Sequence, residues 1–289
     1  MKNWILAARP KTLTAAVIPV ITGTALAAGE RIRIDWALFL FALLGALFIQ
    51  IGTNLINDVA DFRKGSDTAE RLGPVRVTQA GLLSERQVAG GAFMAFAAAV
   101  LCGIPLVVHG GIPLIIIGVA SLVAGYAYTA GPFPLAYHGW GDFFVILFFG
   151  VVAVGGSYFL QTGTISIQAL LAGVSVGSLA AVLIAVNNLR DRQGDLHSGK
   201  RTLAVRFGVR LARVEIAMLA LAPFVIGAYW LSRGQHLAFL LPLLVLPLAV
   251  AIIRSARRDS GRELNRTLGK AAALHALHGI LFSLGVVLQ

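Results

Sequence analysis

Two segments of the chain carry side chains that could bind a metal ion. They span residues 54–67 and 187–202 and together hold five of the 13 acidic residues. Each follows a long apolar run and presents asparagines and then aspartates: Asn54, Asn57 or Asp58 and Asp61 in the first, and Asn187 or Asn188, Asp191 and Asp195 in the second. Residues three or four positions apart share a helix face, so each segment predicts one polar stripe. We expect the two stripes to form one site from two halves.

The chemistry that these stripes favour is metal binding. Aspartates stacked on one helix face repel each other, and they are costly to desolvate near a membrane. Mg²⁺ removes this conflict, and proteins usually hold it with a few carboxylates, phosphate oxygens and water, so the stripes predict a site for Mg²⁺-bound diphosphate. The alternative is that the aspartates pair with Arg63, Arg190 and Arg192 and only solvate the helix ends. The same Asn-before-Asp order in both segments favours the metal site.

The composition of the whole chain indicates a membrane protein. The 289 residues are 57% hydrophobic and 13% charged, with a mean hydropathy of +0.82, whereas soluble domains are about 25% charged. These long apolar runs are continuous and do not alternate as barrel strands do, so we predict an all-α, polytopic membrane protein with a single domain over residues 1–289. The nine predicted spans lie at residues 12–28, 36–57, 88–108, 112–129, 141–161, 166–188, 211–231, 236–254 and 269–287.

Positive charge is distributed unevenly across this predicted topology. Of the 24 basic residues, only Arg31, Arg33 and Arg233 fall on the side opposite the N-terminus. Cytoplasmic loops of membrane proteins carry the excess of Lys and Arg, so the N-terminus is expected in the cytoplasm and Gln289 outside. The expected cytoplasmic loops are residues 58–87, 189–210 and 255–268. The net charge of +11 therefore reflects topology and requires no nucleic-acid partner.

Several stretches of the chain match the motifs of one known family. The first acidic segment matches the pattern Asn-Asp-x-x-Asp-x-x-x-Asp at Asn57, Asp58 and Asp61, but Gly65 stands at the last position and Asp67 lies two residues further on. The chain thus resembles the UbiA superfamily of intramembrane aromatic prenyltransferases. It is most similar to the 1,4-dihydroxy-2-naphthoate polyprenyltransferase branch, at residues 9–13, 71–76, 128–142 and 199–206.

The resemblance implies about nine helices around a central cavity, Mg²⁺ as cofactor, and a role for each polar residue. The residues implied to bind or orient Mg²⁺ are Asn57, Asp58, Asp61, Asp191 and Asp195, with Asn187 or Asn188 in support. The residues implied to neutralise the diphosphate are Arg76, Lys200 and Arg201, helped by Arg63 and Lys64. The aromatic residues that could shelter an allylic cation are Tyr126, Tyr128 and Tyr137, for which an interfacial belt position is the alternative. The implied catalytic residues are the four aspartates and Tyr128.

The implied reaction transfers a polyprenyl chain from a polyprenyl diphosphate to 1,4-dihydroxy-2-naphthoate, with release of diphosphate and carbon dioxide. The product would be demethylmenaquinol in menaquinone biosynthesis, made in the lipid bilayer of a bacterial inner membrane with the site toward the cytoplasm. Other acceptors, such as 4-hydroxybenzoate, haem or a chlorin, are alternatives. A cation-coupled transporter is a further alternative. It is disfavoured because a carrier site is expected near the midplane, whereas both acidic segments lie at the cytoplasmic ends of predicted spans.

Overall fold

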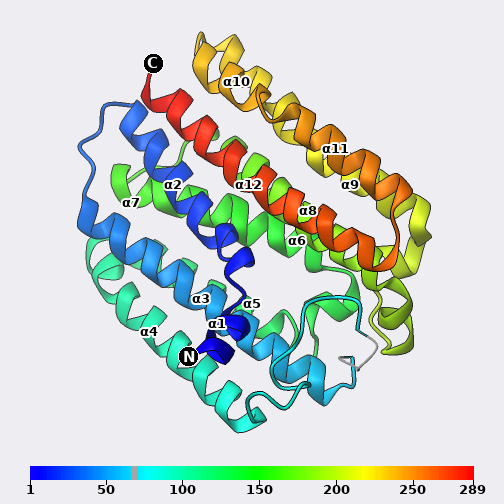
Figure 1. Ribbon diagram of the computed structural model, residues 1–289. Helices are drawn as coiled ribbons and strands as arrows, with labels where there is room; N and C mark the ends of the chain where they lie inside the picture. The colour runs from blue at the N-terminus through cyan, green and yellow to red at the C-terminus, as the bar shows by residue number, and fades with distance from the viewer. Residues whose placement is uncertain (67–70) are drawn as a thin grey trace.

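A computed structural model describes residues 1–66 and 71–289, and this described part is helical without strands. The α-helices are α1 (Lys2–Ala8), α2 (Thr14–Gly29), α3 (Trp36–Arg63), α4 (Glu85–Gly110), α5 (Ile112–Ala127), α6 (Gly141–Ile146), α7 (Ala153–Thr162), α8 (Ile167–His197), α9 (Leu203–Ser232), α10 (His236–Leu243), α11 (Leu246–Arg258) and α12 (Leu264–Val287). The 3-10 turns η1 (Pro10–Thr12), η2 (Leu135–His138) and η4 (Gly261–Glu263) and the π-helical η3 (Leu147–Val152) connect them. Figure 1 shows the long helices as one bundle.

The predicted all-α, multi-pass membrane fold is confirmed, and each of the nine predicted spans coincides with helix. In the described residues, 6 helices are long and apolar enough to cross a membrane, or up to 8 if each bent pair is one span. The bent pairs are Lys2–Thr12 with Thr14–Gly29, at 50°, and His236–Leu243 with Leu246–Arg258, at 43°. The remaining predicted span falls on α5, which has only 16 residues. The count of nine is therefore approximate.

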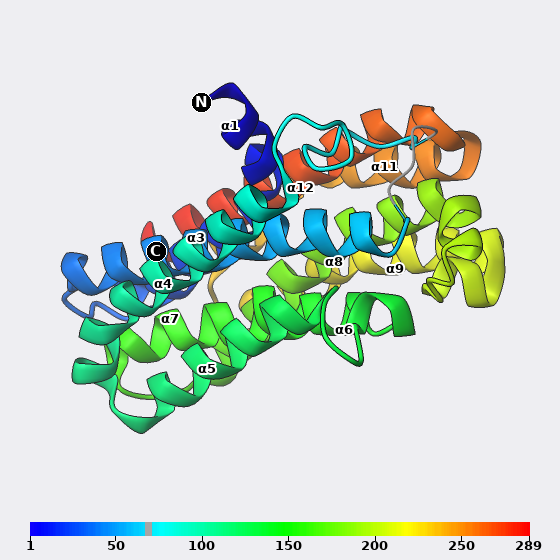
Figure 2. The same cartoon turned by 90° about the horizontal axis from the view of Figure 1, so that it is seen from below.

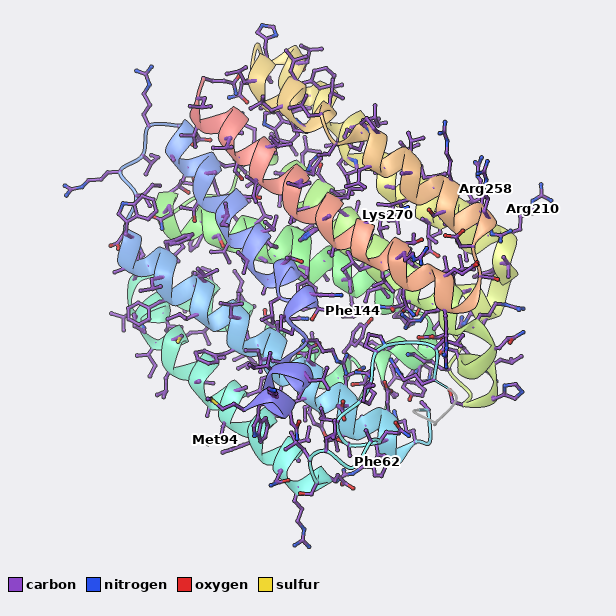
Figure 3. The ribbon with its side chains drawn as sticks, in the orientation of Figure 1. Phe62, Met94, Phe144, Arg210, Arg258 and Lys270 are labelled. Carbon is purple, nitrogen blue, oxygen red and sulfur yellow. The ribbon has the colours of Figure 1, made fainter. Side chains whose placement is uncertain are left out.

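Helix α8 lies in the interior of the bundle, and small residues allow its neighbours to approach it. A Cβ atom on Gly150 of η3 would lie 2.2 Å from the carbonyl oxygen of Gly173, so the two backbones are in contact there. Such close approach at small residues is typical of helix pairs in membranes. In contrast, α4 exposes large apolar side chains such as Phe93, Met94 and Val108, and Figure 3 shows Met94 on the outer side of α4. This apolar outer surface is suited to lipid.

The two helices that carry the acidic segments end in the same way. In α3, the amide of Ser66 donates to the carbonyl oxygen of Asp61 at 2.9 Å, and Gly65 adopts a positive φ of 66°. In α8, the amide of Lys200 donates to the carbonyl oxygen of Asp195 at 2.8 Å, and the intervening glycine has a φ of 74°. Both ends have the hydrogen bond and left-handed glycine of a Schellman motif. Asp61 and Asp195 therefore hold the same place relative to their helix ends.

The N-terminal helix projects from one face of the bundle, as Figure 2 shows, and its Ala7 packs against α3 and α4. The side-chain amide of Asn3 donates to the carbonyl oxygen of Leu82 at 3.0 Å, which ties α1 to the connection that precedes α4. The chain then turns at Arg9, whose φ of 52° lies in the left-handed region that is uncommon for a residue with a side chain. This turn directs the following residues down into the bundle as α2.

Candidate functional site

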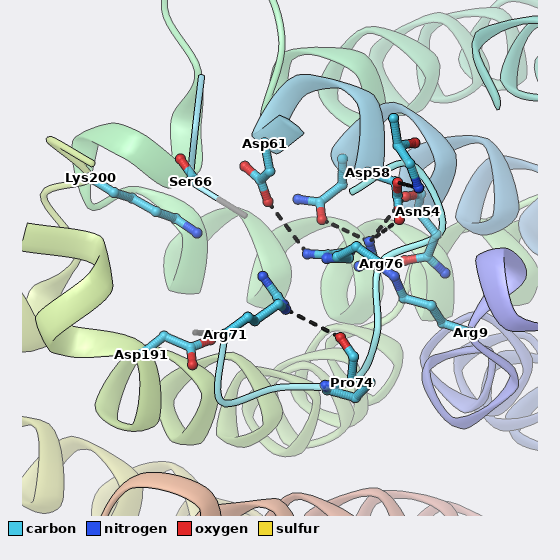
Figure 4. Close-up of polar contacts among 12 residues, drawn as sticks. Arg9, Asn54, Asp58, Asp61, Ser66, Arg71, Pro74, Arg76, Asp191 and Lys200 are labelled. Carbon is cyan, nitrogen blue, oxygen red and sulfur yellow. Dashed lines mark hydrogen bonds and ion pairs between the residues drawn. The ribbon is translucent and has the colours of Figure 1, made fainter. Parts of the chain in front are cut away.

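The two acidic segments, which the sequence predicts to form one site, lie close together at one end of the bundle. Figure 4 shows the side chains of Arg71 and Lys200 between those of Asp61 and Asp191, with Arg76 beside Asp61. The carboxyl group of Asp195 is also close enough to four charged side chains for their charges to act on it. These are Asp61, Asp191, Lys200 and Arg71. Asp67, the remaining aspartate of the first segment, lies outside the described residues. Residues that are more than a hundred positions apart thus share one polar site.

Asp58 is the most buried of the site aspartates, at 1% exposure. Its Oδ1 accepts a hydrogen bond from the amide of Thr78 at 3.0 Å, and its Oδ2 accepts one from the amide of Val77 at 3.3 Å. Because backbone amides use both oxygens, the carboxylate holds the chain next to Arg76 in place. The structure thus gives Asp58 a positioning contact, and its predicted contact with metal stays a prediction.

Asp61 lies at the centre of the polar contacts. Its Oδ2 is 3.4 Å from the guanidinium of Arg76, and its Oδ1 accepts a hydrogen bond of 2.8 Å from the hydroxyl of Tyr137. The same hydroxyl lies 2.6 Å from Oγ of Ser66. All of these side chains except that of Ser66 are buried. The first segment therefore presents one carboxylate that is held between a cation and a phenol.

Tyr137 also contacts two lysines through its ring. The ammonium of Lys64 lies 3.9 Å from the ring centroid, and that of Lys200 lies 5.5 Å from it. Lys64 donates in addition to the carbonyl oxygen of Thr129 at 2.8 Å. Desolvation lowers the pKa of Lys64, the negative charge of Asp61 opposes this shift, and the positive charge of Lys200 adds to it. Both lysines, which come from different helix ends, thus face the same aromatic ring.

In the second segment, Asp191 is paired with its neighbour Arg190. Two hydrogen bonds of 2.8 and 2.6 Å join the guanidinium to the carboxylate. Arg190 also donates to Oδ1 of Asn265 at 2.7 Å, and the amide of Asn265 donates to the carbonyl oxygen of Leu72 at 2.9 Å. This chain of contacts connects α8, α12 and the connection that carries Arg71 and Arg76. The pairing of an acidic-segment aspartate with Arg190, named as the alternative to metal binding, is thus present at Asp191.

Asp195 differs from the other aspartates because one of its oxygens has no donor. Its side chain is 8% exposed, and within the described part of the chain its buried Oδ2 has no hydrogen-bond partner. Oδ1 lies 3.9 Å from the ammonium of Lys200. A buried carboxylate oxygen without a donor is costly, and a cation or a ligand proton would satisfy it.

The sequence analysis missed Arg9 as a site residue. Its guanidinium donates to Oδ1 of Asn57 at 3.0 Å and to the carbonyl oxygen of Asn54 at 3.3 Å, and it lies 4.0 Å from Oδ2 of Asp58. The amide of Asn54 donates in turn to the carbonyl oxygen of Ala8 at 2.9 Å. The match at residues 9–13 was a signal, but the sequence does not show that the left-handed turn at Arg9 aims its side chain at α3.

Some predicted site residues lie away from the two aspartate segments. Arg63 is exposed and paired with Glu85 at the start of α4, so the structure does not bring it to the diphosphate-binding position. Tyr126 is 49% exposed. The side chain of Arg201 is exposed, and only its backbone contacts Tyr137, through a hydrogen bond of 2.9 Å to the tyrosine carbonyl oxygen. Asn187 is half-buried on α8. Their roles in binding stay predictions.

A small cavity lies next to the aspartates, with about 220 Å³ of empty space. Its walls include the predicted residues Tyr128, Asn188 and Lys200, together with Asp142 at the start of α6. The phenol of Tyr128 is close enough to three carboxylates for their charges to act on it, those of Asp61, Asp142 and Asp195. Tyr128 is thus part of the cavity wall and is also close to both aspartate segments.

The residues of the site fit Mg²⁺ that is shared with a phosphate ligand. In the ranges that the structure describes, no group of three or more His, Cys, Asp or Glu side chains could hold a metal ion by itself. Mg²⁺ rarely needs such a cage, because it retains water and takes ligands from substrate phosphates and one or two carboxylates. The unpaired Oδ2 of Asp195 beside basic side chains is suited to this kind of binding.

Comparisons with known proteins agree with this geometry. The model of the UbiA prenyltransferase family matches residues 16–277. A protein of Haemophilus influenzae named 1,4-dihydroxy-2-naphthoate octaprenyltransferase is 34% identical over 299 residues, which cover 100% of this chain and 96% of that protein. The protein of the same name in Escherichia coli is 34% identical over 294 residues, which cover 99% of this chain and 95% of that protein.

A solved structure has the same fold. The structure of a UbiA homologue from Archaeoglobus fulgidus bound to GPP and Mg²⁺ matches with a TM-score of 0.68 at 16% sequence identity. The match covers 99% of this chain and 100% of that one. This likeness concerns the fold alone, whereas the family model covers most of the sequence. With the helical bundle and the paired aspartate segments, these matches show that the chain belongs to the UbiA prenyltransferase family.

Proposed function

We propose that this protein transfers a polyprenyl chain from a polyprenyl diphosphate to 1,4-dihydroxy-2-naphthoate. Diphosphate and carbon dioxide are released, and the product is demethylmenaquinol for menaquinone biosynthesis. The proposal for the acceptor rests on the full-length relatives of H. influenzae and E. coli, whose names state this acceptor. The proposal for a transferase, as opposed to a cation-coupled transporter, rests on family membership.

The observation that carries the proposal is the juxtaposition of two aspartate segments with basic side chains between them. Arg71 and Lys200 lie between Asp61 and Asp191, and Arg76 pairs with Asp61. A departing diphosphate needs positive charge at the place where its negative charge develops. Carboxylates on both sides are suited to the metal that diphosphate binds. This arrangement supports a reaction in which the bond between the prenyl carbon and diphosphate breaks.

Mg²⁺ is the cofactor of this proposal. Asp61, Asp191 and Asp195 would hold it, with Asn57 and Asp58 supporting from the end of α3. When bound, the ion neutralises charge on the diphosphate and so stabilises its departure. Tyr137 is suited to the diphosphate end of the site, because its buried ring lies beside both lysines and its hydroxyl donates to Asp61.

The location proposed for the enzyme is a bacterial cytoplasmic membrane, with the N-terminus and the site on the cytoplasmic side. Basic residues support this orientation, because they gather at the end of the bundle that carries the site. Figure 3 shows Arg210, near the start of α9, and Arg258, at the end of α11, projecting from the edge of the bundle. The polyprenyl substrate would reach the site from the bilayer.

The proposal is tested with purified protein, Mg²⁺, a prenyl diphosphate and carboxyl-labelled 1,4-dihydroxy-2-naphthoate. We expect one carbon dioxide released for each diphosphate, and no transfer when the metal is chelated. A parallel reaction with 4-hydroxybenzoate identifies the other acceptor class, because that product would keep its carboxylate. Label retained in the lipid product contradicts the naphthoate acceptor, and full transfer in chelator contradicts the metal.

A further inference from the structure

One carboxylate near the site belongs to neither aspartate segment. Asp142 lies in the first turn of α6, is 5% exposed, and lines the small cavity beside Tyr128, Asn188 and Lys200. Within the described ranges its buried Oδ1 has no hydrogen-bond partner. A buried carboxylate oxygen at a cavity wall without a donor calls for a ligand that supplies one.

The position of Asp142 in its helix does not account for this oxygen. An acidic side chain in the first turn is favoured by the positive end of the helix. That effect explains why a carboxylate is tolerated here, but it supplies no donor to Oδ1. The ammonium that lines the same cavity, Lys200, is 3.9 Å from Oδ1 of Asp195. A molecule in the cavity is placed to supply the donor that Asp142 lacks.

The cavity is placed for a second substrate next to the diphosphate position. Lys200 belongs to both, since it lines the cavity and lies between the two aspartate segments in Figure 4. Tyr128 lies within reach of the charges of Asp61, Asp142 and Asp195, so it adjoins both Asp142 and the two segments. A molecule in the cavity would therefore contact Asp142 beside the place proposed for the diphosphate.

We infer that Asp142 binds the aromatic acceptor by accepting a hydrogen bond from one of its phenolic hydroxyls. This inference rests on the proposed function. A hydroxyl that donates to a carboxylate transfers electron density to its ring, and the ring carbon then attacks the prenyl cation more readily. Asp142 in this way selects acceptors with a hydroxyl at that position, because an acceptor without it would leave the buried carboxylate unpaired.

The experiment is a thermodynamic cycle in which the carboxylate of Asp142 and one hydroxyl of the acceptor are removed singly and together. Inhibition of prenyl transfer is measured with 1-hydroxy-2-naphthoate and 4-hydroxy-2-naphthoate, each lacking one hydroxyl of the acceptor, on the parent protein and on Asp142→Asn and Asp142→Ala. In the parent, loss of the hydroxyl that Asp142 binds is expected to weaken binding about tenfold to a hundredfold. In Asp142→Ala this penalty should fall to about threefold or less, with Asp142→Asn between them.

Two measurements separate this inference from a structural defect and from a wrong function. Mg²⁺-dependent binding of geranyl diphosphate should be unchanged in Asp142→Asn, which shows that the variant is folded. Transfer to 1,4-dihydroxy-2-naphthoate by the parent is measured first, so failure of the proposed function is recognised before any variant is compared.

A matched control is Glu215→Gln. Glu215 is a half-buried carboxylate on the adjacent region of α9 that does not line the cavity, so this variant should keep the full penalty for the missing hydroxyl. The inference is overturned if Asp142→Ala keeps that penalty, or if Glu215→Gln removes it equally.

Discussion

Replacing Asp58 by alanine tests whether this residue builds the site. The carboxylate is 1% exposed and accepts two backbone hydrogen bonds, from Val77 at 3.3 Å and from Thr78 at 3.0 Å. A hydrogen bond to a charged group contributes about 1.5 to 3 kcal/mol, so the pair contributes about 3 to 6 kcal/mol to holding this connection. At about 1.4 kcal/mol for each factor of ten, even the lower value corresponds to roughly a hundredfold change in local opening.

The assay is native-state hydrogen exchange, which reports the local opening of individual segments. In Asp58→Ala, peptides that contain the amides of Val77 and Thr78 should exchange at least about a hundredfold faster, since the amides lose their acceptor. Asp58→Asn keeps one acceptor oxygen and should show a smaller increase. Asp35→Asn is the control, because Asp35 caps the opposite end of α3 through Ala37 and Leu38. Unchanged exchange at residues 77–78 in Asp58→Ala would refute the positioning role.

Three further changes probe the site and its orientation. Tyr137→Phe removes the hydroxyl that donates to the first-segment carboxylate but keeps the ring, so kcat/KM for prenyl transfer should fall about tenfold; unchanged kcat/KM contradicts a role for the hydroxyl. Gly141→Ala places a Cβ 3.1 Å from the hydroxyl of Tyr128 and should raise the acceptor KM, whereas Gly155→Ala, where a Cβ meets nothing within 4 Å, should not; equal KM values would show that the wall tolerates the methyl group. Ser198→Cys, in a background without the native cysteine, should react with a membrane-impermeant thiol reagent only after the cells are permeabilised. Labelling in intact cells would show that this loop lies outside, opposite to the predicted topology.

The sequence predicted the helices and the two halves of the site because both depend on local patterns. Apolar runs of about 20 residues can hardly be anything but spans in a chain with so few charges. The two acidic segments look alike, and the structure gives α3 and α8 the same C-terminal hydrogen bonds, at Asp61 and Asp195. Helical spacing correctly put Asn57 and Asp61 on the side of α3 that meets the rest of the site.

The partners of these side chains could not be predicted, because they depend on tertiary contacts. Asp58 follows Asn57 directly and so points about 100° around the helix from it, toward the backbone near Val77. Arg63 is only two positions from Asp61, yet it pairs with Glu85 on the outside of the bundle. No pattern in the sequence distinguishes these outcomes.

The two halves of the site, similar in sequence, hold their carboxylates differently. In the first half, backbone amides occupy Asp58, and Arg76 and Tyr137 hold Asp61. In the second half, Asp191 is paired with its neighbour, and Asp195 keeps a buried oxygen that has no donor among the described residues. Groups that are already paired keep their geometry when a ligand arrives, whereas an unpaired buried oxygen gains most from a cation. We therefore expect the first half mainly to set the positions of the basic side chains, and the second half to supply the oxygen that gains most from a metal ion.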